Sequence, residues 1–225
     1  MKLTTMICAF FATHTIIAQQ ASVQENVHLG AGLVGAKKTE SHKAEGSQYF
    51  NDLFIPAKKN GSDTDILIRY NAFNDQIEIN ENNNTISLTP QRDIEITTID
   101  RKNTYVYTEF VSKNGDILNG YLSIISKNNL FTLYKRERII YEPEVHQTSS
   151  YDQYKPPRYK KLDNEYFFKM NNQVILAFPK KKKDLEKLFS GKEKELNLFI
   201  KENKISLSDE FDLIKLSNYL NTLLK

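Results

Sequence analysis

The feature that most constrains the fold is an alternation of apolar and polar residues with a period of two, which begins at Asp65 and ends at Phe178. Successive side chains of a strand point to opposite faces of a sheet, so this period predicts half-buried strands. Turn residues such as Asn82-Asn83-Asn84 and Asn114-Gly115-Asp116 separate the runs. The alternating runs cover residues 65–70, 76–79, 85–88, 94–99, 104–111, 118–126, 130–141, 165–170 and 174–178.

The spacing of these runs predicts how the strands are connected. Most turns recur at roughly 10 to 14 residues, which is typical of an antiparallel meander. No helical pattern of ten or more residues interrupts the series, which argues against a parallel βαβ fold. The sequence therefore predicts a strongly curved antiparallel sheet or a partly closed barrel. Residues 142–158 are polar and are predicted to form a long loop before the last hairpin.

After Pro179 the apolar period becomes helical and predicts two to three C-terminal helices. Gly191 is expected to terminate the first helix, and Ser208 is expected to cap the third. The apolar positions are Leu185, Leu188 and Phe189, then Leu196, Phe199 and Ile200, and finally Phe211, Ile214, Leu220 and Leu224. The predicted class is α+β, with an antiparallel β domain over 46–178 and a helical segment over 179–225 packed on the sheet.

The first residues predict export. Met1-Lys2 is positive, a short apolar run follows, and the small Ala18 precedes polar residues, which is the pattern of a signal peptide cleaved near Ala18. The run is shorter than the ~20 residues of a membrane span, so no transmembrane span is expected in the mature chain. Residues 19–45 lack a sustained apolar period and are predicted to be a flexible lead. The expected location is periplasmic, outer-membrane-associated or secreted.

Composition excludes several classes of function. The only cysteine, Cys8, lies within the predicted signal, so the mature chain has no thiol for a disulfide, for catalysis or for a metal. The 31 Lys and Arg residues nearly balance the 28 Asp and Glu residues, which leaves a net charge of +3. Nucleic-acid binding requires a denser basic field, so no nucleic acid is expected as a partner.

Motifs for a metal, a cofactor or nucleophilic catalysis are missing. His28, His42 and His146 have no metal-ligand spacing, and residues 63–65 lack the rest of a calcium loop. Neither a Gly-x-Ser-x-Gly motif nor a glycine-rich phosphate loop occurs. We therefore predict no catalytic, cofactor-binding or metal-binding residues.

One enzymatic alternative depends on carboxylates. A hydrolase that uses two acids needs them about 5 to 10 Å apart across a cleft. Convergence of Asp75, Glu78 or Glu109 around one pocket would favour this alternative. Glu142 and Glu144 flank a proline in the predicted loop and are expected to be solvated.

The predicted loop contains the best candidate surface for recognition. Exposed tyrosines combine flat apolar area with a polar tip, which suits contacts with proteins or sugars. The candidate partner-binding residues are Tyr151, Tyr154, Arg158 and Tyr159. The alternative is that these tyrosines pack over the end of the sheet.

Two segments carry a family resemblance. Residues 46–57 (GSQYFNDLFIPA) and 67–79 (LIRYNAFNDQIEI) resemble the patterns GSPYL…F.PA and LRYNAYNDEIE of a group of uncharacterised exported proteins of the Bacteroidetes. The resemblance covers about residues 46–224, its most specific part is Arg69-Tyr70-Asn71, and Gln76 departs from an acid in the pattern. It implies an envelope protein but no activity and no catalytic residue.

These observations together predict an exported, envelope-associated protein that acts as a non-enzymatic interaction or structural module. Its expected partner is an envelope protein, a glycan or a lipid, and no cofactor is expected. Arg69, Tyr70, Asn71 and Asp75 are expected to define the fold as turn and strand residues. The alternatives are a lipid- or glycan-binding module, which requires an unfilled apolar concave face, and a carboxylate-dependent hydrolase.

Overall fold

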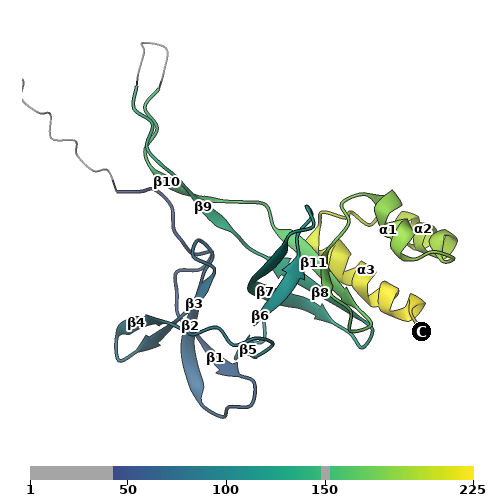
Figure 1. Cartoon of the computed structure of the whole chain (residues 1–225), viewed down its shortest axis with the longest axis horizontal. Helices are drawn as coiled ribbons and strands as arrows, with labels where there is room; N and C mark the ends of the chain where they lie inside the picture. The colour runs from purple at the N-terminus through teal and green to yellow at the C-terminus, as the bar shows by residue number, and fades with distance from the viewer. Residues whose placement is uncertain (1–42, 148–152) are drawn as a thin grey trace, which may run out of the picture. The chain divides into compact units, whose positions relative to one another are not determined.

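The computed structural model describes residues 43–147 and 153–225, and these residues form strands followed by three helices (Figure 1). The α+β prediction is therefore confirmed. The predicted signal peptide and most of the predicted lead lie outside the described residues. The strands are β1 (Ile55–Lys59), β2 (Asp65–Asn71), β3 (Gln76–Glu81), β4 (Asn84–Ser87), β5 (Glu95–Thr98), β6 (Thr104–Val111), β7 (Ile117–Lys127), β8 (Phe131–Arg136), β9 (Ile139–Glu142), β10 (Arg158–Lys161), β11 (Glu165–Met170) and β12 (Ile175–Ala177).

Five of these strands close into a barrel. β6, β7, β8, β11 and β12 pair in that order as antiparallel neighbours, and β12 then pairs with β6 in parallel, with Ile175 opposite Phe110. Alternate residues of each strand point inward, so the interior is filled by Phe110, Leu122, Tyr134, Phe167 and Ile175. The prediction of a curved, barrel-like meander is confirmed, and the barrel is fully closed.

The remaining strands of the main sheet continue from β6 in the order β5-β1-β2-β3-β4. Their apolar face packs on the outer face of β6 and β7, where the Tyr70 ring lies 5.3 Å from that of Tyr105 and 6.3 Å from that of Tyr121. β1 was not among the predicted runs, because Ala57 is its only fully buried residue and gives little alternation.

The helices cover the opposite side of the barrel. They are α1 (Lys182–Leu188), α2 (Glu193–Glu202) and α3 (Glu210–Leu223). Phe131 and Leu133 of β8 and Phe168 of β11 pack on buried leucines of all three helices, including Leu185 and Leu213. Among the described residues, no helix is long and apolar enough to cross a membrane.

The third helix differs from its prediction at two positions. Asp209, and not Ser208, is the N-cap, because its side chain accepts the amide of Asp212 at 3.0 Å. Phe211 is 84% exposed and lies outside the apolar stripe, whereas Leu213 is completely buried. Phe211 and Leu213 each lie on a face of the helix that carries apolar residues at a period of 3.6, so the sequence pattern allowed either face to be buried. Packing of α3 on β8 buries the face that carries Leu213.

The predicted strand over 130–141 and the predicted loop over 142–158 also need correction. The chain leaves the barrel after Arg136, and β9 pairs with β10 as a separate two-stranded ribbon. Beyond these strands, Val145 and Lys155 exchange backbone hydrogen bonds of 2.9 and 3.0 Å, so much of the predicted loop is paired. The segment was predicted as a loop because it contains prolines and polar residues. A solvent-exposed two-stranded ribbon tolerates such residues as well as a loop does.

Candidate functional site

The ribbon of β9 and β10 carries most of the residues predicted to bind a partner (Figure 1). Arg158 and Tyr159 open β10, and Tyr154 lies further along, near the bridge between Val145 and Lys155. Tyr151 lies outside the described residues. The predicted set is therefore divided along the ribbon, and its members have different neighbours.

One face of the ribbon is charged and internally paired. Arg158 Nε and Lys160 Nζ donate to the two carboxylate oxygens of Glu142 at 2.7 and 2.9 Å. Hydrogen bonds from Lys160 and Arg158 hold the pKa of the Glu142 carboxyl below its ordinary value. Arg158 therefore joins β10 to β9, although half of its side chain is exposed.

The other face of the ribbon is aromatic. The Tyr159 ring lies 5.3 Å from that of Phe73 and 5.4 Å from that of Tyr141, with ring planes at 73° and 58°. Tyr141 is 44% exposed and Phe73 is 39% exposed. We call Phe73, Tyr159 and Tyr141 the aromatic row. Sequence analysis missed Phe73 and Tyr141, although Tyr141 stands at the end of a predicted strand.

Tyr154 belongs to a second group on the ribbon. Its hydroxyl donates to Glu144 Oε2 at 3.3 Å, and its ring lies 6.3 Å from that of His146. His146 Nε2 is 3.4 Å from the other oxygen of Glu144. The three side chains contact one another across the ribbon, where Tyr154 is 41% exposed and the His146 side chain is 61% exposed.

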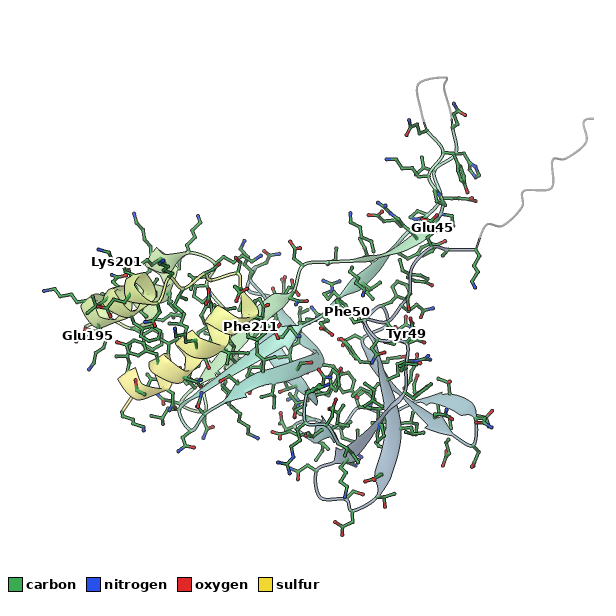
Figure 2. All side chains as sticks on the ribbon, turned by 180° about the vertical axis from the view of Figure 1, so that it is seen from behind. Glu45, Tyr49, Phe50, Glu195, Lys201 and Phe211 are labelled. Carbon is green, nitrogen blue, oxygen red and sulfur yellow. The ribbon has the colours of Figure 1, made fainter. Side chains whose placement is uncertain are left out.

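One residue of the segment before β1 pairs with the base of the ribbon. The amide of Glu45 donates to the carbonyl of Pro157, and its carbonyl accepts the amide of Tyr159, both at 2.8 Å (Figure 2). Gly46 follows with φ of +77°, and a Cβ there would lie 2.7 Å from the Tyr159 carbonyl oxygen. Glu45, which was predicted to belong to the flexible lead, is therefore paired along β10, and only glycine fits at the next position.

A chain of side-chain amides connects the ribbon to the β2–β3 hairpin. Gln48 donates to the hydroxyl of Tyr159 at 3.2 Å and accepts from Asn71 Nδ2 at 3.0 Å. Asn71 Nδ2 also donates to Glu78 Oε1 at 2.8 Å, while its Oδ1 accepts the amides of the turn that follows. The hydroxyl of Tyr159 is thus positioned by Gln48, which is itself held by the buried Asn71.

Glu78 is the most fully paired carboxylate of this network. It accepts from Arg69 NH2 at 2.6 Å, from the Tyr49 hydroxyl at 3.0 Å and from Asn71, and its side chain is 10% exposed. Burial raises its pKa, but the hydrogen bonds from Asn71, Arg69 and Tyr49 outweigh burial and hold the pKa below its ordinary value. Arg69 is itself stacked between the rings of Tyr49 and Phe54, at 3.8 and 4.4 Å. Glu78 is therefore a structural ion and a poor proton donor.

Asp75 attaches the β2–β3 turn to the barrel. Its Oδ1 accepts the hydroxyl of Tyr70 at 2.8 Å and the backbone amide of Tyr121 at 3.1 Å. Its Oδ2 lies 3.7 Å from Arg136 NH2, and a Cβ on Gly120 would overlap this carboxylate. Arg69, Tyr70, Asn71 and Asp75, expected as turn and strand residues, stand at the end of β2 and in this turn.

The three carboxylates of the hydrolase alternative lie in separate clusters. Asp75 and Glu78 have different partners, and Glu109 pairs with Arg92 at 3.2 Å on the outer surface of the barrel. Among the described residues, no group of three or more His, Cys, Asp or Glu side chains could hold a metal ion. No family model, curated protein or solved structure matches the chain, so the resemblance to exported Bacteroidetes proteins stays a prediction.

Proposed function

We propose that this chain is an exported, envelope-associated interaction module without enzymatic activity, and that it binds a partner protein through the ribbon of β9 and β10. The observation that carries the proposal is the aromatic row, in which Phe73 and Tyr141 are each about two-fifths exposed beside Tyr159. The export signal supports the location.

The aromatic row has the properties of a binding anchor. Tyrosine and phenylalanine supply large contact areas at a small cost in side-chain entropy, and they are enriched where interfaces are strongest. Tyr159 is held by two neighbouring rings and by the hydrogen bond from Gln48. A surface that is already ordered loses little conformational freedom on binding, which favours affinity.

The alternatives have less support from the described residues. A lipid carrier requires an unfilled concave face, whereas the barrel interior holds Phe110, Tyr134 and Phe167. A carboxylate hydrolase requires two acids that share a cleft, whereas Asp75 and Glu78 are each bonded to their own set of partners.

The test is site-specific crosslinking in the envelope of the source organism. A photoreactive phenylalanine at position 141 should give one dominant crosslinked protein, and the same substitution at position 211 should not. Phe211 is the matched control because it is also an exposed aromatic residue, and it belongs to helix α3 and not to the ribbon. Tyr141→Ala together with Phe73→Ala should abolish co-purification of that protein. Equal crosslinking from both positions, or a protein that purifies alone, would contradict the proposal.

A further inference from the structure

A cavity of about 200 Å³ lies between the segment before β1, the middle of β2 and the start of β6. Phe50 of that segment, labelled in Figure 2, lines the cavity, and so does Leu53, which is 72% exposed. The volume is below the range of about 300 to 1,000 Å³ that is typical for drug-sized ligands, so the cavity suits a smaller molecule.

The walls of this cavity are aromatic. Tyr70 and Tyr105 both line it, and their rings lie 5.3 Å apart at 33°. Phe50 also lines it and is half-buried. The faces of aromatic rings carry negative partial charge and attract cations within about 6 Å of the ring centre.

Two polar side-chain groups that line the cavity have no hydrogen-bond partner among the described residues. In the described part of the chain, no hydrogen bond is found for the hydroxyl of Tyr105 or for the side-chain amide of Asn103. The other tyrosine hydroxyl, that of Tyr70, is already committed to Asp75 at 2.8 Å. Tyr105 and Asn103 can therefore each offer an oxygen to the N–H groups of a bound molecule.

The ion pairs around the cavity leave the carboxylate of Glu137 with only a share of one ammonium group. Glu137 lines the cavity and lies 3.2 Å from Lys135, but Lys135 is also 3.2 Å from Glu210, so one ammonium serves two carboxylates. Arg69 lines the cavity and is paired with Glu78 at 2.6 Å, and Lys161 Nζ lies 4.7 Å from the centre of the Phe50 ring. The second oxygen of Glu137 has no hydrogen-bond donor among the described residues.

We propose that this cavity binds a small organic ammonium ion, with its charge beside Glu137 and its carbon chain against the rings of Phe50, Tyr70 and Tyr105. In this arrangement the carboxylate attracts the charge, the rings contact the carbon chain, and Tyr105 and Asn103 accept hydrogen bonds from the ammonium group. The aromatic row does not line the cavity, and the contact between the cavity and the ribbon is that of Lys161 of β10 with the Phe50 ring.

The experiment is a titration of the folded chain with n-butylammonium chloride, followed by NMR and by calorimetry at neutral pH. Butanol and sodium butyrate serve as the neutral and anionic probes of similar shape. Saturable binding of butylammonium is expected, with binding of the other two at least about tenfold weaker, which corresponds to 1.4 kcal/mol. Equal binding of butanol and butylammonium, or no saturable binding of butylammonium, would overturn the proposal.

Variants of the wall locate the binding site. Glu137→Gln should weaken butylammonium binding about tenfold, and Glu109→Gln, which removes a carboxylate from the outer barrel surface, should leave it unchanged. Because Glu137→Gln also breaks the pair with Lys135, Tyr105→Phe provides a second variant that keeps the ring and removes one hydroxyl. It should weaken binding several-fold. Unchanged binding in Tyr105→Phe, or in a folded Glu137→Gln, would refute the assignment.

Discussion

Replacing Glu78 with Gln removes one charge from the ion pair that Arg69 and Glu78 form between β2 and β3. The two side chains are 17% and 10% exposed, and the shortest distance between them is 2.6 Å. Breaking a buried pair by removing one partner costs about 3 to 5 kcal/mol, because the remaining charge stays buried without compensation. Arg69 would retain the rings of Tyr49 and Phe54, so we expect the lower end, about 3 kcal/mol.

Urea unfolding measures this loss. The free energy of unfolding falls by about 2 kcal/mol per molar urea. A loss of about 3 kcal/mol of stability therefore lowers the urea concentration at the unfolding midpoint by about 1.5 M. The matched control is Glu109→Gln, since Glu109 and Arg92 form a pair in which both side chains are about half exposed. That change should cost less than about 0.5 kcal/mol. Equal midpoints for the two variants would refute the reasoning.

A double-mutant cycle and a pH series separate charge pairing from other effects. Arg69→Met in the Glu78→Gln background should cost about 2 kcal/mol less than in the native chain, and strict additivity would contradict direct pairing.

The pKa of Glu78 is depressed in the folded protein, so its contribution is present above the unfolded pKa of about 4.3 and is lost as pH falls through the folded value. The difference in the free energy of unfolding between the native chain and Glu78→Gln should therefore be constant near pH 7 and shrink below about pH 4.

Three further predictions follow from single positions. Gly46→Ala places a Cβ against a β10 carbonyl at a φ of +77°, so amide exchange in β10 should accelerate at least about tenfold, and unchanged exchange would contradict the pairing. Leu213→Ala should cost about 2 to 5 kcal/mol in urea unfolding, whereas Phe211→Ala should cost less than about 0.5 kcal/mol. Burial raises the pKa of Tyr121 and of Tyr134 to about 12. Because these values exceed the unfolded value of about 10, stability should fall between pH 10 and 12, and an ultraviolet titration in which every tyrosine ionises near pH 10 in the folded state would contradict this.

Local periodicity predicted much of the fold. The alternation over 104–111 identified β6, and the structure shows that Val106 and Phe110 are the residues of this strand that point into the barrel. The change of period after Pro179 identified the helical segment, and Gly191, with φ of +84°, follows α1 as expected. These features depend on neighbours within a few residues, which is the range over which a sequence pattern acts.

The candidate site was predictable only in part. Tyrosines near residue 159 indicated a recognition surface, but the aromatic row also needs Phe73 from the β2–β3 turn and Tyr141 from β9. These residues meet because β9 pairs with β10 and because Gln48 links Tyr159 to Asn71. Contacts across such separations leave no periodic signal in a single sequence.

By itself the sequence determined most of the segments that become strands or helices, because backbone conformation follows largely from local sterics, turn residues and the spacing of apolar side chains. Only the tertiary structure decided that β12 closes on β6, that α3 buries Leu213 and exposes Phe211, and that Glu78 is bound by Arg69. In each case several faces or partners were possible locally. The contacts between segments that are distant in the sequence determine which of them is removed from water. That choice is set by the free energy of the assembled core, to which all the packed segments contribute at once.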